Sequence, residues 1–400
     1  MRALILTNEF PPSIYGGAGV HVDELTRQLR SLIELDVRTF GEQSDQAPGW
    51  RVLGYPPAHD LAGTDARLRP MLGALSRDLS MVADPVSADV VHAHTWYTHF
   101  AGLLARLAYG IPLILTVHSL EPLRPWKREQ LGGGYEVSSW IERIVLETAD
   151  AVVAVSSETR EDVLRLFDIP PERVHVIHNG IDSDFYHPDD GAAALERYGI
   201  DPTVPYVLFV GRITRQKGIV HLVRAIRHLD PGIGVVLCAG QPDTPEIGEE
   251  MERGVSEARA ERSNVVWIGE MVSREEARQL YSRAAVFCCP SVYEPFGIIN
   301  LEAAACETPV VASAVGGIPE VVVDGETGLL VPVELRLDDP MSPIDPDRFE
   351  LNLAGAINAL MADAPTREVM GRAARQRAVE RFSWARIAEE TVDLYRSLLA

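Results

Sequence analysis

Short apolar segments alternate with helical patterns along the whole chain, and no other feature of the sequence restricts the fold as strongly. The predicted strands, rich in Val, Ile and Leu, lie at 3–7, 90–92, 113–118, 151–155, 174–177, 206–210, 234–239, 265–268, 286–289, 310–312 and 328–331. Helices are predicted between them at 21–31, 140–148, 160–167, 218–228, 274–284 and 297–305. Apolar strands joined by helices form parallel sheets that are covered on both faces. The sequence therefore predicts an α/β fold.

The pattern begins twice in the same way. The strand at 3–7 leads into a loop with Gly16 and Gly17 and then into a helix, and the strand at 206–210 leads into loop 211–218 and a second helix. Doubly wound parallel sheets bind their ligands outside the carboxyl ends of the strands. Two such sheets are expected to turn these ends toward one central cleft.

Two domains are expected, because 400 residues exceed the size of one compact domain. The segment 182–205 is rich in Pro and Asp, which suits a linker. We predict one Rossmann-like, doubly wound domain at 1–181 and a second at 182–383. The amphipathic helix at 384–400 is expected to pack back on the first domain.

The charge balance limits the classes of ligand. The chain has 37 Lys and Arg against 58 Asp and Glu, a formal net charge of −21. A field of this sign repels a phosphate backbone, so nucleic acid is not an expected partner. An anionic substrate must be met by a few locally placed cations.

Neither a membrane span nor a disulfide framework is predicted. The first apolar run is too short for a signal peptide, and the most apolar stretch, 102–117, is interrupted by Arg, Gly and Pro. The four cysteines form no CxxC pair, which is typical of reduced, buried thiols. We expect a soluble cytoplasmic protein.

Two carboxylates flank the start of a predicted helix. Glu294 lies in the loop after the strand at 286–289, the helix begins near Gly297, and Glu302 lies in its second turn. A helix N-terminus suits an anion, and carboxylates accept hydrogen bonds from hydroxyls. The pattern favours a ligand with both phosphate and diols, although a loop acid and a solvated helix acid would show the same spacing.

Two cations follow the strand that opens the second half. Arg212 and Lys217 come directly after the strand at 206–210, where a guanidinium fork and an ammonium group can bind a diphosphate. An ordinary surface Arg and Lys remain the alternative. Together with Glu294 and Glu302 the cations describe a nucleotide-sugar site. No GxGxxG fingerprint is present, so a nicotinamide cofactor is not indicated.

These residues resemble the retaining GT-B glycosyltransferases, the clan of bacterial glycogen synthases, sucrose synthases and mannosyltransferases. Five motifs carry the resemblance in the family's order: the glycine-rich loop 16–21, His118, the segment 179–182 before the second domain, the R-x4-K pair Arg212 and Lys217, and the E-x7-E pair Glu294 and Glu302. The resemblance covers essentially the whole chain. It implies the GT-B fold, with two Rossmann-like domains facing a cleft, the first binding the acceptor and the second the nucleotide sugar.

Finer features resemble users of ADP-glucose. The stretches 239–246 and 293–297 are similar to those of ADP-glucose-dependent glycogen synthases. The stretches 10–17 and 119–127 resemble a shorter subgroup that makes α-maltose-1-phosphate from ADP-glucose and glucose-1-phosphate. His94-Thr95-Trp96 departs from the His-Asp-Trp of the longer glycogen synthases, which argues against a polymer-type acceptor site.

The resemblance implies a role for each donor-side residue. The implied catalytic residues are His118, Arg212, Lys217 and Glu294. The implied donor-binding residues are Gly16, Gly17, Phe296, Gly297, Ile298, Ile299 and Glu302. The two cations would stabilise the departing ADP, Glu294 and His118 would hold the glucose, and Glu302 would hold the ribose. No metal or other cofactor is expected, because the cations and a helix N-terminus would supply the electrostatic stabilisation.

Candidate acceptor residues lie in and near the loop after His118. They are His94, Arg124, Trp126, Lys127, Arg128 and Tyr135. The cations could clamp a sugar phosphate and the aromatic rings could stack on sugar. A solvated basic loop that shields an acidic surface remains the alternative.

Two apparent metal motifs are not interpreted as metal sites. Asp182-Ser183-Asp184 has the DxD spacing but lies in the linker. His92, His94 and His99 have no Cys, Asp or Glu nearby at ligand spacing, so we expect them to line the cleft.

The expected activity is retaining α-1,4-glucosyl transfer from ADP-glucose to glucose-1-phosphate, in the service of α-glucan synthesis. Alternatives are extension of a glycogen or other α-glucan end and transfer from a UDP-sugar to another small acceptor. A nucleotide-sugar epimerase and a catalytically inactive nucleotide-sugar sensor are less consistent with the intact motifs. The sequence leaves the oligomeric state open, a homodimer included.

Overall fold

A computed structural model describes residues 1–58, 61–124, 127–128, 133–336 and 339–400. The chain divides into two compact units, residues 1–180 with 384–400 and residues 181–383. The division falls one residue before the predicted boundary. The C-terminal helix belongs to the first unit. Each unit is an α/β structure with a predominantly parallel sheet.

The first unit contains an eight-stranded sheet in the order β3-β4-β2-β1-β5-β6-β7-β8. Its strands are β1 (Arg2–Thr7), β2 (Glu34–Phe40), β3 (Ser44–Ala47), β4 (Trp50–Tyr55), β5 (Val90–His94), β6 (Leu113–Val117), β7 (Ala151–Ala154) and β8 (Val174–Val176). The pairs are parallel except for the antiparallel β3–β4 pair at the edge.

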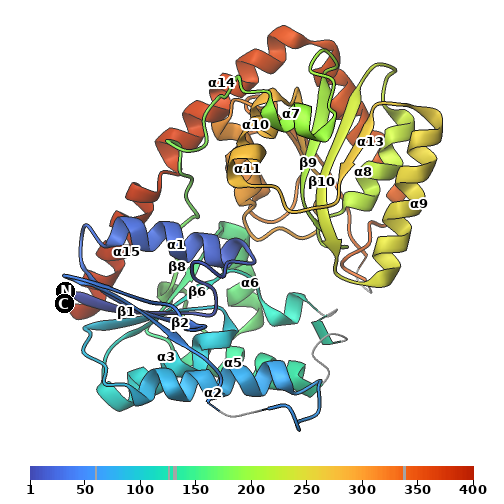
Figure 1. Cartoon of the computed structure of the whole chain (residues 1–400). Helices are drawn as coiled ribbons and strands as arrows, with labels where there is room; N and C mark the ends of the chain where they lie inside the picture. Colours follow the sequence, from blue (N-terminus) through green and yellow to red (C-terminus); the bar gives the residue numbers. More distant parts are fainter. Residues whose placement is uncertain (59–60, 125–126, 129–132, 337–338) are drawn as a thin grey trace. The chain divides into compact units, whose positions relative to one another are not determined.

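Helices cover both faces of this sheet (Figure 1). They are α1 (Gly17–Leu29), α2 (Arg69–Ala83), α3 (Trp96–Tyr109), α5 (Gly133–Thr148), α6 (Ser157–Leu166) and α15 (Trp384–Leu399), with short 3-10 turns at Glu121–Leu123 and Pro171–Arg173. Ala3 and Ile5 of β1 pack in the core under α1 and α15, whereas Leu4 and Leu6 pack in the core under α2, α3 and α5. This alternation is the period of two that a doubly covered strand requires.

The strands β2, β3 and β4 were not predicted, because β2 and β4 carry charges where a buried strand is expected to be apolar and the short strand β3 is exposed. Arg38 of β2 is fully buried, and its guanidinium pairs with Asp36 at 3.0 Å. It also donates to the carbonyl oxygens of Asp84 at 3.0 Å and Pro85 at 2.8 Å. Asp36 in turn accepts from Arg51 of β4 at 2.6 Å. The strand is stable with these charges inside because each of them is paired and hydrogen-bonded.

Replacing Asp36 with Ala is expected to destabilise the first unit by about 3–5 kcal/mol, since it leaves Arg38 as a buried charge without its carboxylate. Denaturant unfolding followed by circular dichroism measures this loss. The matched control is Asp65→Ala, which breaks only the exposed Arg67–Asp65 pair. Equal unfolding midpoints for the two variants would contradict the structural role of Asp36.

The second unit contains a fully parallel six-stranded sheet in the order β11-β10-β9-β12-β13-β14. Its strands are β9 (Tyr206–Ile213), β10 (Gly234–Pro242), β11 (Val265–Ile268), β12 (Val286–Cys289), β13 (Val310–Ser313) and β14 (Gly328–Val331). Each coincides with a predicted strand within three residues at either end. These segments are short and almost wholly apolar, so their sequence signal is strong.

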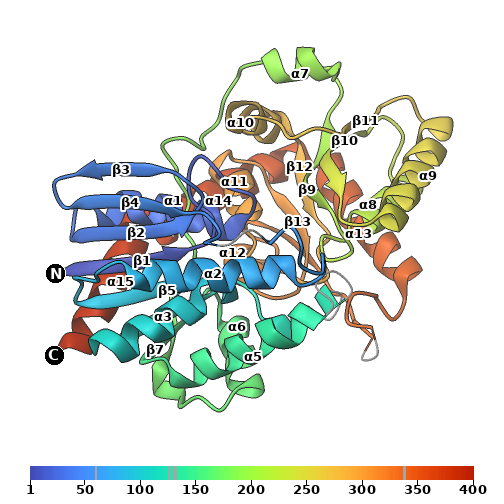
Figure 2. The ribbon, with the colours of Figure 1, turned by 60° about the horizontal axis from the view of Figure 1, so that its bottom comes forward.

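Helices also cover both faces of the second sheet (Figure 2). They are α7 (Ala193–Tyr198), α8 (Ile219–Ala225), α9 (Pro245–Glu261), α10 (Arg274–Arg283), α11 (Ile298–Ala305), α12 (Ile318–Val321), α13 (Pro346–Ala362) and α14 (Ala364–Arg381), with a 3-10 turn at Ile226–His228. One core joins α8, α9 and α13 to the sheet. On the opposite face α10, α11 and α14 pack in sequence.

Two further predictions concern the chain as a whole. All four cysteines are buried and free, as predicted. Among the described residues, no helix has the length and apolar character needed to cross a bilayer.

Candidate functional site

The order of the second sheet reverses at β9, which lies between β10 and β12. Parallel sheets bind ligands at the carboxyl ends of the strands at such a point. The loops that follow β9 and β12 touch there, since the Val292 amide donates to the Gln216 carbonyl oxygen at 2.9 Å. Gly218 has a φ of +62°, and a Cβ at this position would lie 2.0 Å from the Pro290 carbonyl oxygen. Glycine is therefore required for the close approach of the two loops.

Lys217 and Glu294 meet where these loops touch. The Lys217 Nζ lies 2.5 Å from the Glu294 Oε2, and only 16% and 8% of the two side chains are exposed. The Ser291 hydroxyl donates to the same carboxylate oxygen at 3.2 Å. Burial by itself would lower the pKa of Lys217, but the charge and hydrogen bond of Glu294 outweigh it and raise the pKa above its usual value. Lys217 is therefore a charged ammonium group at neutral pH.

Arg212 adds a second cation at the end of β9. Its guanidinium is 3.1 Å from the Asp243 carboxylate, which follows β10. Its charge also acts on Lys217, whose pKa it lowers. The structure thus brings the predicted R-x4-K pair and Glu294 together at one edge of the sheet.

The predicted donor-binding segment opens α11. Phe296 is buried and packs on Phe382 with ring centroids 5.8 Å apart, so only its backbone can face a ligand. Gly297 has a φ of +93°, and a Cβ there would lie 2.5 Å from the Asn300 amide nitrogen. Ile298 and Ile299 are partly buried in the first turn. The first backbone amides of a helix have no partner within the helix, and these are the groups that a helix start offers to polar ligands.

Glu302 is held by two tyrosines that no sequence pattern selected. The Tyr281 hydroxyl donates to the Glu302 Oε2 at 2.9 Å, and Tyr186 also hydrogen-bonds this carboxylate. Burial raises the pKa of Glu302, while the two hydroxyls act in the opposite direction. The tyrosines come from α10 and from the segment before α7, so only the folded chain shows the contact.

Three histidines come together in the first unit. His118 follows β6, His94 ends β5, and His21 lies in α1. The His94 Nδ1 is 3.2 Å from the His118 Nε2, and the rings of His21 and His118 have centroids 4.7 Å apart. Burial lowers the pKa of His21 to about 4 and those of His94 and His118 well below the usual value, with neighbouring histidines adding to the last two. All three rings are therefore neutral at pH 7.

The histidines of the first unit are more deeply buried than the sequence predicted. His94 has no exposed surface, so its ring cannot make the predicted direct contact with an acceptor in this structure. His92 is also buried, with Nδ1 2.6 Å from the Tyr395 hydroxyl and Nε2 2.7 Å from Thr116. His99 is buried as well. The expectation that His92 and His99 line a cleft is wrong, because both rings are enclosed in the unit.

The glycine-rich loop is folded around an acidic side chain. The backbone amides of Tyr15 and Gly16 donate to the Glu9 carboxylate at 2.8 and 2.7 Å. Gly17 begins α1. The Gly16 amide therefore already has an acceptor, and the implied contact of this amide with a donor phosphate requires Glu9 to be displaced.

Two of the three candidate acceptor cations form ion pairs with carboxylates. Arg124 lies 3.5 Å from the Glu121 carboxylate, and the exposed Arg128 lies 2.8 Å from Glu136. Lys127 is partly buried between them in the chain. The three cations occupy one segment, but the two arginines are held by residues of the same unit.

Tyr135 does not have the position expected for stacking on a sugar. Its ring is buried, its hydroxyl donates to the Glu121 carbonyl oxygen at 2.8 Å, and the Arg128 guanidinium lies 5.3 Å from its centroid. The ring is therefore part of the core between α2 and α3. Trp126 lies outside the described residues.

Comparisons with known proteins decide the family. Residues 15–185 match the model of Glycosyltransferase Family 4, and residues 192–339 match that of Glycosyl transferases group 1. The chain is 51% identical to an α-maltose-1-phosphate synthase of Mycolicibacterium smegmatis, over the full length of both proteins. This chain belongs to the GT-B glycosyltransferases. An α-maltose-1-phosphate synthase of Mycobacterium tuberculosis is 49% identical, again over the full length of both.

More distant relatives share the same architecture. A D-inositol 3-phosphate glycosyltransferase of Kribbella flavida is 32% identical, over 96% of this chain and 91% of the relative. Among solved structures, sucrose-phosphate synthase of Thermosynechococcus elongatus superposes with a TM-score of 0.80 at 26% identity, over 100% of this chain and 99% of that one. The predicted GT-B fold is confirmed.

Asn300 is a buried polar residue beside the predicted donor-binding segment of this glycosyltransferase, and sequence reasoning missed it. It lies in the first turn of α11 with no exposed surface. Neither amide atom has a hydrogen-bond partner among the described residues. A buried amide without a partner is unfavourable, and Asn300 is such a group in the first turn of the helix that the predicted donor-binding segment opens. The signal in the sequence was a polar residue within the apolar run Ile-Ile-Asn-Leu.

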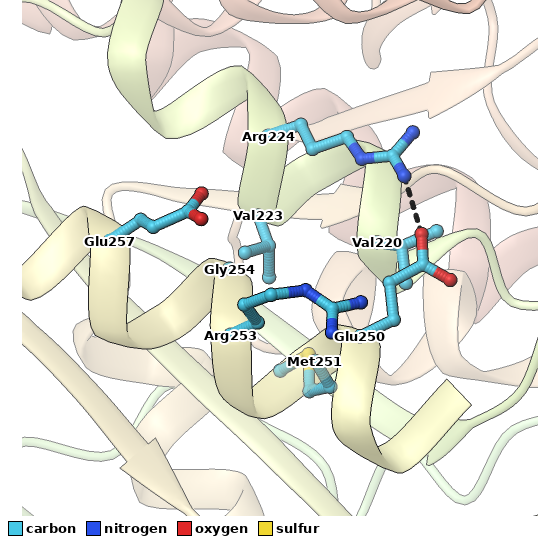
Figure 3. A pocket seen from close by; sticks show the side chains of 8 residues that line it. All are labelled: Val220, Val223, Arg224, Glu250, Met251, Arg253, Gly254 and Glu257. Atoms are coloured by element: carbon cyan, nitrogen blue, oxygen red, sulfur yellow. Dashed lines mark hydrogen bonds and ion pairs between the residues drawn. The ribbon is translucent and has the colours of Figure 1, made fainter. Parts of the chain in front are cut away.

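A pocket elsewhere in the second unit of the glycosyltransferase does not belong to this site. Figure 3 shows it between α8 and α9. Its volume is about 220 Å³. It is lined by Val220, Val223, Arg224, Glu250, Met251, Arg253, Gly254 and Glu257. Arg224 and Glu250 form an ion pair across it, so part of its charge is already compensated.

Proposed function

We propose that this glycosyltransferase transfers glucose from ADP-glucose to glucose-1-phosphate, with retention of the α configuration, and forms α-maltose-1-phosphate. The second unit would bind the nucleotide sugar and the first unit the acceptor. The observation that carries the proposal is the Lys217–Glu294 pair beside Arg212 at the strand ends of the second sheet.

The cations would act on the leaving group. The bond between the glucose C1 and the diphosphate oxygen breaks, and negative charge develops on that oxygen. Lys217 and Arg212 are held in place by Glu294 and Asp243 before the reaction, so little reorganisation is needed to stabilise the charge. Preorganised stabilisation of this kind is usually the largest contribution to catalysis.

Retention would follow from attack on the same face. The acceptor O4 forms the new bond to C1, and the departing phosphate oxygen takes the O4 proton. Glu294, the backbone amides at the start of α11 and His118 would hold the glucose. Glu302, positioned by Tyr281, would hold the ribose hydroxyls.

The choice of ADP rests on the stretch 239–246, which resembles that of ADP-glucose users. In the structure it runs from the end of β10 into α9, and it includes Asp243, the partner of Arg212. The stretch is therefore next to the cations that would bind the diphosphate.

The choice of acceptor is supported by the relatives. The names of the full-length relatives state α-maltose-1-phosphate as the product, and that of a more distant one states D-inositol 3-phosphate. Both names contain a small phosphorylated sugar or cyclitol. The segment with Arg124, Lys127 and Arg128 would supply the phosphate contacts in this chain.

Release of ADP from ADP-glucose tests the proposal under four conditions: no acceptor, glucose-1-phosphate, glycogen and D-inositol 3-phosphate. We expect rapid release with glucose-1-phosphate and an α-1,4-linked maltose-1-phosphate by NMR. A chelator is expected to leave the rate unchanged. Faster release with glycogen would instead indicate a polymer-extending synthase, and release only from UDP-glucose would overturn the ADP assignment.

Replacing Arg124 with Gln is expected to raise the KM for glucose-1-phosphate about 10- to 100-fold with a smaller change in kcat, the loss of one charge-assisted hydrogen bond to phosphate. Steady-state kinetics at saturating ADP-glucose measures it. Arg67→Gln, at an exposed arginine paired with Asp65, is the control. An unchanged KM for glucose-1-phosphate would show that Arg124 does not bind the acceptor phosphate and serves only as a structural partner of Glu121.

A further inference from the structure

The cluster of His21, His94 and His118 has the composition of a transition-metal site. One ring nitrogen from each residue lies within 4.8 Å of the others. The His94 Nδ1 and His118 Nε2 are already 3.2 Å apart. Two nitrogens bound to a tetrahedral zinc ion at its usual bond length are about 3.3 Å apart. The two nitrogens therefore already have the spacing of one edge of a zinc tetrahedron, and a metal ion would replace the proton of their hydrogen bond while the ring of His21 moves inward.

The ring of His21 has a nitrogen that the fold leaves unused. The Nε2 of His21 is buried and has no hydrogen-bond partner among the described residues. The Nδ1 of His21 is 2.6 Å from the Asn179 Oδ1. With Nδ1 donating to this oxygen, the Nε2 of His21 presents its lone pair. A metal-binding histidine is typically oriented by such a bond from its other ring nitrogen.

The kind of metal follows from the ligands. The cluster consists of imidazoles, which suit zinc, cobalt, nickel and copper, whereas magnesium and calcium prefer oxygen ligands. His21 and His94 are buried and His118 is only partly so, which leaves an approach on the side of His118. Three imidazoles with one open position are an established zinc arrangement.

We propose that His21, His94 and His118 bind one zinc-like transition-metal ion, and that this ion inhibits glycosyl transfer. The inhibitory part rests on the proposed function, in which His118 supports the donor sugar. A metal bound to the His118 ring would hold it in the cluster and place a doubly charged cation beside the sugar. The metal is thus a regulator of the reaction and not a requirement for it.

Cobalt titration tests the binding without any sugar present. The chelator-treated full-length protein is titrated with Co²⁺, and competition with a chromophoric chelator gives the Zn²⁺ affinity. We expect one equivalent of cobalt with the intense visible bands of tetrahedral coordination. In His21→Gln the affinity should fall at least 10-fold, whereas His228→Gln, at an exposed histidine of the second unit, should bind as the unchanged protein does.

X-ray absorption at the zinc edge of the unchanged protein keeps the test independent of how the variant folds. Three imidazole nitrogens around zinc are expected. Fewer than three, no bound equivalent, or equal affinity in His21→Gln would overturn the site and leave only adventitious binding.

Measurements of activity then test whether the bound metal inhibits glycosyl transfer. Stoichiometric Zn²⁺ is expected to lower ADP release at least 10-fold, a chelator should restore it, and His21→Gln should resist it. Zinc bound at the three histidines with undiminished turnover would overturn the inhibitory part. Because the cobalt spectrum needs no substrate, failure of the proposed reaction and failure of the metal site are distinguishable.

Discussion

Replacing Lys217 with Ala is expected to lower kcat about 100- to 1,000-fold, the usual effect of removing one preorganised donor from a site of developing negative charge. Lys217 is held 2.5 Å from Glu294 and is largely buried, so no solvent cation can take its place with the same geometry. The rate of ADP release at saturating substrates measures the loss.

Arg215 offers a matched control for this variant. It lies on the same loop but is exposed, and Arg215→Ala is expected to leave kcat unchanged. Lys217→Met, which keeps most of the side-chain volume, separates the loss of charge from the loss of packing. Near-normal turnover in Lys217→Met would refute the assigned role of the ammonium group.

Replacing Glu294 with Gln is expected to lower kcat/KM about 100- to 1,000-fold, because it weakens two charge-assisted contacts at once. One is the contact with Lys217, and the other is the proposed contact with the glucose hydroxyls. The variant keeps the size of the side chain, so the effect is electrostatic. Glu275→Gln, at an exposed acid of α10, is the control.

The pH profile of Glu294→Gln provides a second readout. Burial lowers the pKa of Lys217, and Glu294 is the principal group that raises it again. Without this carboxylate the pKa of Lys217 falls, so the ammonium group loses its proton at lower pH. The alkaline limb of the residual activity should therefore move toward neutral pH. An alkaline limb at the unchanged position would show that Glu294 does not sustain the charge of Lys217.

Local sequence patterns predicted most of the strands, and they failed where tertiary pairing replaces apolar character. The strands of the second unit are short apolar runs, which carry their own signal. β2 is a central strand of the first sheet and yet contains Asp36 and Arg38. These charges are tolerated because Arg51 and the carbonyl oxygens of Asp84 and Pro85 surround them. No local pattern contains that information.

In the candidate site, too, some residues could be predicted from the sequence and others could not. Arg212, Lys217, Glu294 and Glu302 follow strand ends in the sequence, so their meeting at one sheet edge could be predicted from topology. The partners Tyr281 and Tyr186 of Glu302 could not, since they come from other elements. The sequence also suggested Tyr135 as an exposed stacking ring, whereas packing in the core of the first unit decides its position.

By itself, the sequence determined the α/β class, the two-fold repetition of the Rossmann-like pattern and the identity of the charged residues at the strand ends. Periodicity and loop position are properties of the chain, so they can be read without coordinates. Only the tertiary structure decided which charges are paired, that Glu9 accepts the Gly16 amide, and that three histidines far apart in the chain share one cluster. Lys217 and Glu294 are 77 positions apart, and His21 and His118 are 97 positions apart, so only folding brings the members of each pair within a few ångströms of each other.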